Sequence, residues 1–291
     1  MTTTAISIRG LAKSYGDHRA VDGLDLDIHS GEVFALLGPN GAGKTTTVEI
    51  LEGFRHRDAG EVSVLGADPH HAGRSWRDRI GIVLQTSGGL DLLTPREVLA
   101  STARCYRSPQ DVDAVLSAVG LAEKADDRVV GLSGGQRRRL DVGLGIIGDP
   151  ELLFLDEPTT GFDPQARREF WGLIKGLAGD GTTILLTTHY LDEAEQLADR
   201  VGVIASGRLL ALDTPANLGG RHREEATVSW EEGGVRRSIR TATPTADVAA
   251  LAARFPGEVP ELTVTRPSLE DTYLSLIAPH VTDETRTEVP A

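Results

Sequence analysis

Short, largely apolar runs recur along the chain, and each is followed by glycine or by polar residues. They occupy Val33 to Leu37 ("VFALL"), Leu152 to Leu155 ("LLFL") and Thr183 to Thr187 ("TILLT"). Runs of this length without polar alternation are typical of strands that are buried on both faces of a sheet. A helical pattern at residues 164–178 separates the second run from the third. Strands that alternate with helices predict an α/β fold with a parallel sheet.

Two other blocks do not follow this core pattern. Residues 6–32 alternate between apolar and polar positions, which predicts an N-terminal antiparallel β subdomain of half-exposed strands. Residues 86–145 read mainly as helix, and Thr94, Pro95 and Glu97 have the spacing of a helix start with a capping box. We expect this second block to be a helical subdomain inserted into the α/β core.

The composition changes again after about residue 215. Gly233 and Gly234 predict a hairpin turn, and Ser268 is placed to cap a last helix. These signals indicate a small α+β appendage, followed by a polar end that we expect to be disordered. The predicted divisions are a main domain at residues 1–217, an accessory domain at 218–280 and the tail at 281–291.

The charge and composition narrow the range of partners. Asp and Glu total 43 against 30 Lys and Arg, which gives a formal net charge of −13. We therefore expect no nucleic-acid partner, because phosphate neutralisation needs a basic surface. The single cysteine, Cys105, fits a reducing cytosol. The chain shows no signal-peptide pattern, and no apolar stretch approaches the roughly 18 residues of a membrane helix, so we expect a soluble protein.

A glycine-rich segment after the first apolar run matches the pattern G-x-x-x-x-G-K-[ST]. Its glycines allow backbone N–H groups to surround phosphate oxygens, and the following helix adds the positive end of its dipole. The lysine supplies a charge to the β- and γ-phosphates, and the threonine offers a hydroxyl to Mg²⁺. The alternative is a plain glycine turn between a strand and a helix. The predicted nucleotide-binding residues here are Gly38, Pro39, Asn40, Gly41, Ala42, Gly43, Lys44, Thr45 and Thr46.

Two carboxylates end the second apolar run and supply what a metal-bound nucleotide requires. Asp156, at the strand end, can hold Mg²⁺ through water, and Glu157 can polarise an attacking water molecule. Taken alone, the pair could equally be two solvated acids at the end of a strand.

A second anion receptor is predicted where a hydroxyl and two glycines precede a helix. Its residues are Leu132, Ser133, Gly134, Gly135 and Gln136. The hydroxyl, the free N–H groups and the helix dipole all favour an anion, although an ordinary helix cap has the same sequence. The following arginines, Arg137 to Arg139, are expected to form a solvated helix face.

This segment also fits the nucleophile elbow G-x-S-x-G of α/β-hydrolases. Ser133 would be the nucleophile, and Asp156 or Asp163 followed by His189 would complete the order Ser–Asp–His. The charged residues before Ser133 make a poor buried strand, however. The hydrolase hypothesis also leaves the glycine-rich segment without a role.

The chain resembles the nucleotide-binding subunits of ATP-binding cassette (ABC) transporters. The resemblance covers about residues 4–215 and rests on "GPNGAGKT", the glutamine of "GIVLQ", "LSGGQ", "LLFLDEPT" and "TTHYLDEAEQLADR", which occur in the family's order and spacing. It implies a P-loop NTPase core. The C-terminal "RPSLEDTYLSLIA" is similar to the end of drug-efflux ATPases of the daunorubicin-resistance type.

The resemblance implies roles for four further residues. Tyr15 would stack on adenine, Gln85 would contact Mg²⁺ and the attacking water, and His189 would stabilise charge on the γ-phosphate. Asp163 would reach across to a second subunit. The chain has Phe162 where leucine is commoner in the family, which removes no catalytic group.

The resemblance also explains why one chain has two anion receptors. In the family, the "LSGGQ" segment of one subunit covers the γ-phosphate that another subunit holds. We therefore expect an ATPase with ATP and Mg²⁺ as cofactors that dimerises head to tail, as a homodimer or a heterodimer. It would drive a separate integral membrane permease, for efflux of a drug, an antibiotic or a lipid, from the cytoplasm at the inner face of the cell membrane. An ABC ATPase of translation or repair is the alternative from another class.

Overall fold

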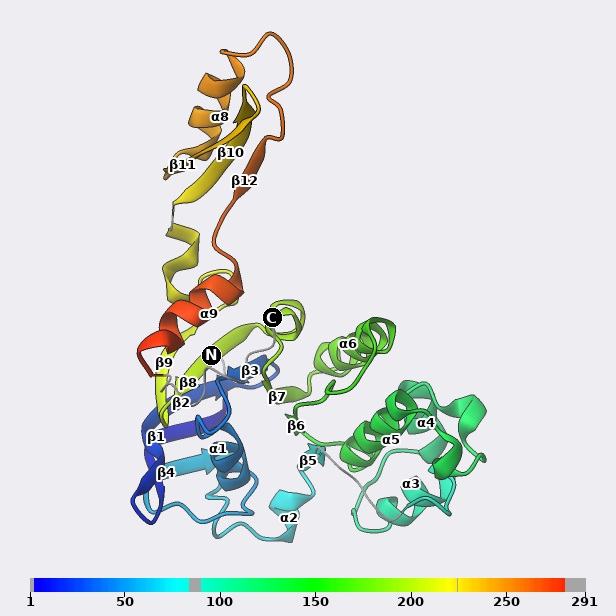
Figure 1. Ribbon diagram of the computed structural model, residues 1–291. Coiled ribbons are helices and arrows are strands. Elements are labelled where there is room, and N and C mark those ends of the chain that lie inside the picture. Colours follow the sequence, from blue (N-terminus) through cyan, green and yellow to red (C-terminus); the bar gives the residue numbers. More distant parts are fainter. Residues whose placement is uncertain (1–2, 84–89, 224, 281–291) are drawn as a thin grey trace.

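The computed structural model describes residues 3–83, 90–223 and 225–280, and its centre is a six-stranded sheet (Figure 1). The strand order is β5-β6-β7-β3-β8-β9, in which only the last pair of neighbours, β8 and β9, is antiparallel. The predicted parallel α/β sheet is thus confirmed. Its strands are β3 (Val33–Leu37), β5 (Ile80–Val83), β6 (Leu152–Asp156), β7 (Thr183–Thr188), β8 (Arg200–Ala205) and β9 (Arg208–Asp213).

Both faces of this sheet are covered, which explains why its central strands lack polar alternation. On one face, Phe34 and Phe154 pack with helices α1 (Lys44–Leu51) and α2 (Arg74–Arg77) and with a three-stranded antiparallel sheet of order β2-β1-β4. On the other face, Ala35 and Leu155 pack with the remaining helices of the core. The predicted antiparallel β subdomain is therefore present. Its strands are β1 (Thr4–Tyr15), β2 (His18–His29) and β4 (Ala59–Val64).

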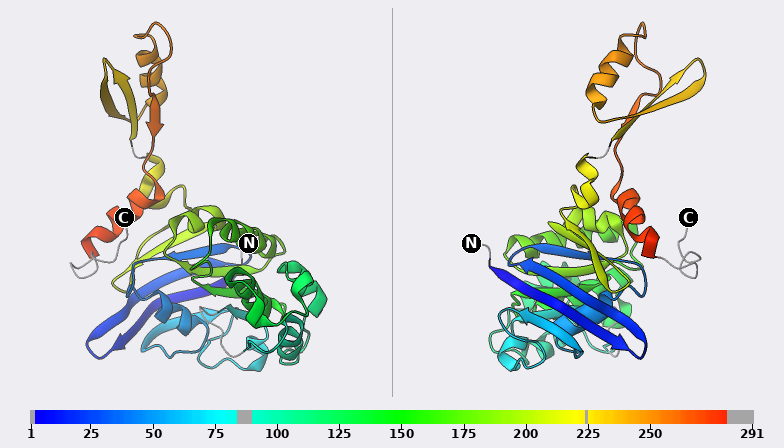
Figure 2. Two further views of the ribbon diagram at one scale, coloured as in Figure 1. Left: turned by 45° about the vertical axis from the view of Figure 1, so that its right-hand side comes forward. Right: turned by 90° about the vertical axis from the view of Figure 1, so that its left-hand side faces the viewer.

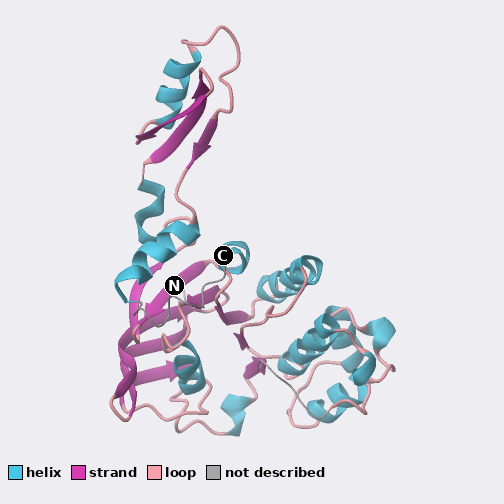
Figure 3. Ribbon diagram, viewed as in Figure 1, coloured by secondary structure: helices cyan, strands magenta, loops and turns pink. Residues whose placement is uncertain are grey.

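The block predicted to be helical contains α3, α4 and α5, which gather on one side of the molecule (Figure 3). The capping box at the start of α3 is present, because Glu97 N–H donates to Thr94 and Thr94 N–H donates back to Glu97. The helices of the described residues are α1 (Lys44–Leu51), α2 (Arg74–Arg77), α3 (Pro95–Ala103), α4 (Val112–Ala118), α5 (Gly134–Ile146), α6 (Pro164–Gly179), α7 (Leu191–Leu197), α8 (Pro244–Ala252) and α9 (Leu269–Ile277).

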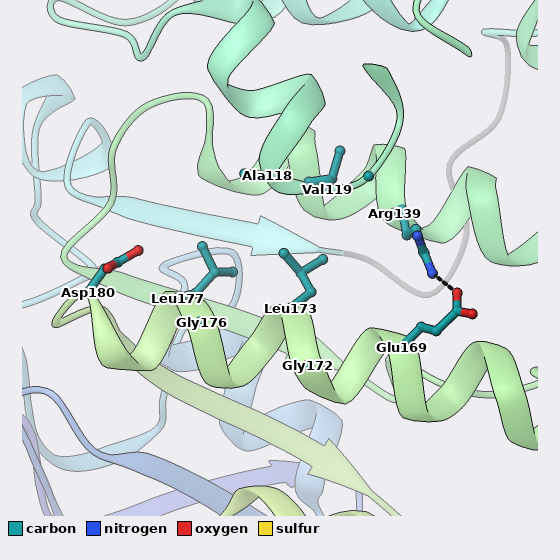
Figure 4. Close-up of a pocket in the computed structure, with 10 residues that line it drawn as sticks. Ala118, Val119, Arg139, Glu169, Gly172, Leu173, Gly176, Leu177 and Asp180 are labelled. Carbon is teal, nitrogen blue, oxygen red and sulfur yellow. Dashed lines mark hydrogen bonds and ion pairs between the residues drawn. The ribbon is translucent and has the colours of Figure 1, made fainter. Parts of the chain in front are cut away.

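Helix α6 meets the helical block across an open groove (Figure 4). The groove is a pocket of about 400 Å³ between the end of α4 and α6, lined on the α6 side by Gly172, Leu173 and Gly176. An ion pair between Arg139 of α5 and Glu169 of α6 closes one end. The α6 residues Arg167 and Trp171 are not among those that line the groove.

The C-terminal appendage stands away from the ATPase-like core in both views of Figure 2. Its sheet has the order β11-β10-β12, and Val228, Trp230 and Leu251 form a separate small apolar cluster. Helix α9 returns to the core, where Leu269 and Ile277 join the main apolar cluster. The tail at 281–291, which we expected to be disordered, lies outside the described residues. The strands are β10 (Ala226–Glu232), β11 (Val235–Thr241) and β12 (Thr263–Thr265).

We predict that Trp230→Ala unfolds the appendage without disturbing the core. Trp230 is 7% exposed and belongs to a cluster of only three buried side chains, so its loss should cost about 3–5 kcal/mol of local stability. Limited proteolysis should then cut within residues 226–265 while ATP binding is retained. Val264→Ala, at a position that is 48% exposed, is the matched control and should leave the digestion pattern unchanged.

Candidate nucleotide-binding and hydrolysis site

The phosphate-binding loop leaves the buried strand β3 and enters helix α1 at Lys44. Gly41 and Gly43 have φ values of 76° and 101°, which side chains rarely adopt. A Cβ atom at Gly38 would lie 2.3 Å from the Ile204 carbonyl oxygen, and one at Gly43 would lie 2.1 Å from the Ala20 carbonyl oxygen. The loop is therefore pressed against the backbone of the two sheets, and glycine is required at both positions.

Lys44 is held inside this loop. Its side chain is 7% exposed, and Nζ donates to the carbonyl oxygens of Gly38 at 2.6 Å and Pro39 at 3.1 Å. Burial lowers the pKa of Lys44, while the nearby carboxylates of Glu157 and Asp156 act in the opposite direction. The ammonium group is thus positioned and poorly solvated, which strengthens its attraction for a phosphate.

A pocket of about 250 Å³ joins residues that the sequence placed in separate motifs. Its walls come from the β1–β2 hairpin, the glycine-rich loop and the end of β6. Tyr15 is 42% exposed there, with the cationic groups of Arg55 and Lys13 at 5.3 and 5.6 Å from its ring centroid. The lining residues are Tyr15, His18, Ala20, Asn40, Gly41, Ala42, Gly43, Lys44, Thr45, Thr46 and Glu157.

The carboxylates and His189 meet because β6 and β7 are adjacent and parallel. The Thr187 hydroxyl donates to Asp156 Oδ1 at 2.5 Å. Glu157 then turns away from the strand through a left-handed backbone conformation, with φ at 43°. Its Oε1 lies 3.3 Å from Nδ1 of His189. The two predicted catalytic side chains are therefore in contact.

The "LSGGQ" segment is folded as predicted but lies apart from this pocket. Ser133 caps helix α5: its hydroxyl accepts from the Gln136 N–H, and the Gln136 side-chain oxygen accepts from the Ser133 N–H. Ser133 and Gly134 are exposed, and Leu132 is buried in the core cluster. Residues 132–136 do not line the pocket of Lys44 and Glu157.

The hydrolase alternative is wrong in this structure. A nucleophile elbow requires a strand before the serine, whereas a 3₁₀ turn, Val129–Gly131, precedes Ser133. The Ser133 hydroxyl accepts from the Gln136 N–H as the cap of helix α5, and no histidine is among its hydrogen-bond partners in the described residues.

Asp163 caps helix α6 by accepting the N–H groups of Gln165 and Ala166. Phe162, the departure from the family's usual leucine, packs edge-on against Phe170 with ring centroids 5.6 Å apart. Phe162 thus adds to the packing of α6 and leaves Asp163 exposed. Gln85, the remaining predicted residue, lies outside the described residues.

The expected solvated face of Arg137 to Arg139 is wrong for Arg138. Its side chain is buried, donating to the carbonyl oxygens of Pro158 at 3.0 Å and Asp156 at 2.8 Å. Arg138 therefore ties helix α5 to the end of β6. Its spacing of four from the buried Val142 was the signal that could have revealed it.

Comparisons with known proteins identify the family of the chain. The family model described as "ABC transporter" matches residues 21–160. The daunorubicin/doxorubicin resistance ATP-binding protein DrrA of Streptomyces peucetius is 37% identical over 320 aligned positions, which cover 99% of this chain and 97% of that protein. The Nod factor export ATP-binding protein I of Rhizobium meliloti is 44% identical over 222 positions, 74% of this chain and 66% of that protein.

The chain belongs to the ABC transporter ATP-binding proteins. It is an ATP-binding and ATP-hydrolysing subunit, as its sequence predicts. Among solved structures, cbiO1 of Clostridium perfringens, part of the ABC transporter complex cbiONQ, has a TM-score of 0.68 at 27% identity and covers 74% of this chain and 90% of that one. Within the described residues, none of the helices has the length and apolar character needed to cross a bilayer.

We predict that Gly43→Ala abolishes ATP binding, whereas Gly41→Ala weakens it only slightly. Both glycines have positive φ, so both variants carry left-handed strain of about 1–2 kcal/mol. Only the methyl group at 43 also meets a backbone atom, which should add about 1–3 kcal/mol and displace the loop. Calorimetric titration with ATP and thermal unfolding of both variants measure the difference. Equal ATP affinities would contradict the packing argument.

Proposed function

We propose that this ATPase powers an exporter, acting as a dimer on the inner face of the membrane beside a separate permease. The observation that supports the proposal is the division of the site within one chain. Lys44 and Glu157 share a pocket, whereas Ser133 stands exposed on another part of the same chain. A second copy is needed to bring a Ser133 to this pocket.

The binding roles follow from where the residues lie. Tyr15 would stack on the adenine ring at one end of the pocket, and the glycine-rich loop would surround the phosphates with N–H groups. Lys44 would exchange its carbonyl contacts for the β- and γ-phosphate oxygens.

The residues present fit Mg²⁺. The hydroxyl of Thr45 is exposed on the pocket wall, and Asp156 presents a carboxylate at the end of β6. No group of three His, Cys, Asp or Glu side chains suited to a metal exists in the described part of the chain. This suits an ion that takes few protein ligands and completes its shell with phosphates and water, with Gln85 as the further ligand that the family resemblance implies. When bound, Mg²⁺ would neutralise charge on the phosphates.

Hydrolysis would use Glu157 and His189 together. Glu157 would accept a proton from the attacking water, and its left-handed backbone turn directs the side chain into the pocket rather than along β6. His189, in contact with Glu157 Oε1, would face the γ-phosphate and stabilise charge as the bond to the leaving oxygen breaks.

The remaining predicted residues would act across a two-fold interface. The "LSGGQ" segment of one copy would cover the γ-phosphate held by the other, and Asp163 would lie at the interface between the copies, here called the seam. The segment consists of Leu132, Ser133, Gly134, Gly135 and Gln136. MJ0796, a bacterial ABC transporter cassette of known dimeric structure, is 25% identical to this chain with a TM-score of 0.64. A homodimer of this kind is isologous, so both sites form or open together.

The cargo class rests on the named relatives. Proteins named for daunorubicin resistance and for Nod factor export match most of this chain. We propose efflux of a drug, an antibiotic or a lipid-like compound by the permease that this subunit serves. Membrane vesicles that contain the subunit and its permease should accumulate such a compound only when ATP is supplied. Accumulation that is independent of ATP would exclude the exporter role.

We predict that Glu157→Gln binds ATP normally and slows hydrolysis at least ~100-fold, because a positioned base contributes on this scale. Phosphate release under saturating ATP measures the rate, and dimers trapped with ATP should become visible on sizing. Glu151→Gln is the control: Glu151 directly precedes β6, pairs with Arg79 and does not line the pocket, so this variant should turn over normally. A Glu157→Gln enzyme that hydrolyses ATP at the wild-type rate would remove Glu157 from this role.

We predict that Ser133→Arg retains ATP binding to the single chain but prevents ATP-driven dimers. A large cation at the helix cap would fill the space that the γ-phosphate of the partner's nucleotide requires. Ser117→Arg, at an exposed position on α4 of the same helical block, is the matched control. Light scattering with and without ATP separates the two variants, and dimers of unchanged abundance in Ser133→Arg would refute the seam.

A further inference from the structure

A fully buried carboxyl group lies behind the catalytic residues. Glu193, in the first turn of α7, has 0% exposure. Neither of its oxygens accepts a hydrogen bond of good geometry from the described residues. Burying a carboxyl group without hydrogen-bond partners lowers the stability of the fold, so the surroundings of Glu193 bear on whether it serves the site.

The surroundings of Glu193 belong to the two loops that carry Glu157 and His189. Thr159 follows Glu157 by two residues, Thr188 directly precedes His189, and both threonines are fully buried. Burial raises the pKa of Glu193, and the side chains of Thr188 and Thr159 lower it in opposition, with a further contribution from Trp171. The carboxyl group is therefore adjacent to both loops at once.

The donors around this carboxyl group also lack partners. Thr159 Oγ1, Trp171 Nε1 and Arg167 Nε are buried and without a hydrogen bond in the described residues. The Thr188 hydroxyl accepts from the Tyr190 N–H at 3.0 Å, which leaves its own proton available to donate. Donors without hydrogen bonds thus surround a carboxyl group without hydrogen bonds. Small movements of the loops would allow these groups to bond to one another.

Two arginines, from helices α5 and α6, lie near this cluster at the start of α7. Arg167 of α6 donates to Asp192 at 3.2 Å and lies 4.3 Å from the Tyr190 ring centroid, so it holds the start of α7. The buried guanidinium of Arg138 is close enough to Glu193 for the two charges to interact. The same Arg138 holds the carbonyl oxygens at the end of β6.

We propose that Glu193 is a positioning residue for ATP hydrolysis. Its carboxylate accepts hydrogen bonds from Thr159 and Thr188 and so fixes the positions of Glu157 and His189 relative to each other. This inference rests on the proposed roles of Glu157 and His189. Glu193 is fully buried and does not line the pocket of Lys44 and Glu157, so it would act only through the two loops. Movement of the loop at Thr159, which runs on to Asp163 at the proposed seam, would reach His189 through the same carboxylate.

The test compares Glu193→Gln with Glu195→Gln in the full-length protein. Gln has the shape of Glu but no charge; the lower cost of burying a neutral amide offsets the lost interaction with Arg138, so the melting temperature should change little. The turnover number should nevertheless fall about tenfold, the scale of one weakened charge-assisted hydrogen bond, with the Kd for ATP unchanged. Glu195, exposed on the same helix, should tolerate the change in all three measurements.

A double-mutant cycle with Thr159→Val identifies the path of the effect. If Glu193 acts through Thr159, the hydroxyl deletion should slow turnover in the wild type but have less than about a twofold further effect in Glu193→Gln. The inference is overturned if Glu193→Gln turns over ATP like wild type, if its turnover and melting temperature fall together, or if the two substitutions are additive. Absence of Glu157-dependent hydrolysis in the wild type would instead refute the proposed function.

Discussion

The site depends on one constraint, the adjacency of β6, β7 and β3 in the parallel sheet. Parallel strands end at the same edge, so the loops that follow them meet although they are far apart in the sequence. Lys44 comes after β3, and His189 comes directly after β7. Asp156 is the last residue of β6, and Glu157 is the next residue in the chain. Apolar layers on both faces fix the sheet and therefore fix this edge, so the loops need only small turns to bring a cation, two carboxylates and an imidazole together.

The sequence was sufficient for the parts of this site that are local. The glycine-rich loop, the capping boxes at Thr94 and Ser133 and the acidic end of β6 each depend on residues within one short segment, where geometry follows from residue type. The buried strands were equally predictable, because a strand covered on both faces does not alternate between apolar and polar residues. The family resemblance then supplied Tyr15 and His189, whose positions the pattern of residues alone did not explain.

The features that were missed are those decided by tertiary packing. Arg138 stands in a run of three arginines that looks solvated, and only the helix periodicity relative to Val142 distinguishes it. Glu193 sits in an acidic helix start, "LDEAE", where every carboxylate appears exposed until α6 is placed against α7. The position of helix α9 is also decided by tertiary packing. The helix follows the appendage in sequence, yet Leu269 and Ile277 are buried in the main core. Apart from the periodicity at Arg138, none of these contacts has a local signature.

Arg138 connects helix α5 with the loop of Glu157, which matters for a site that two copies would share. Helix α5 begins at the serine that would meet a partner's nucleotide, and one turn later Arg138 is bonded to the backbone on both sides of Glu157. The interaction of Arg138 with Glu193 continues this connection to α7 and the residue before His189. Because the two hydrogen bonds of Arg138 are buried and directed at backbone carbonyl groups, a shift of α5 would move the end of β6 with it. If two copies share the site as proposed, this link would carry the engagement of Ser133 to the loop of Glu157 in the same chain, which is a physical requirement for two shared sites to act together.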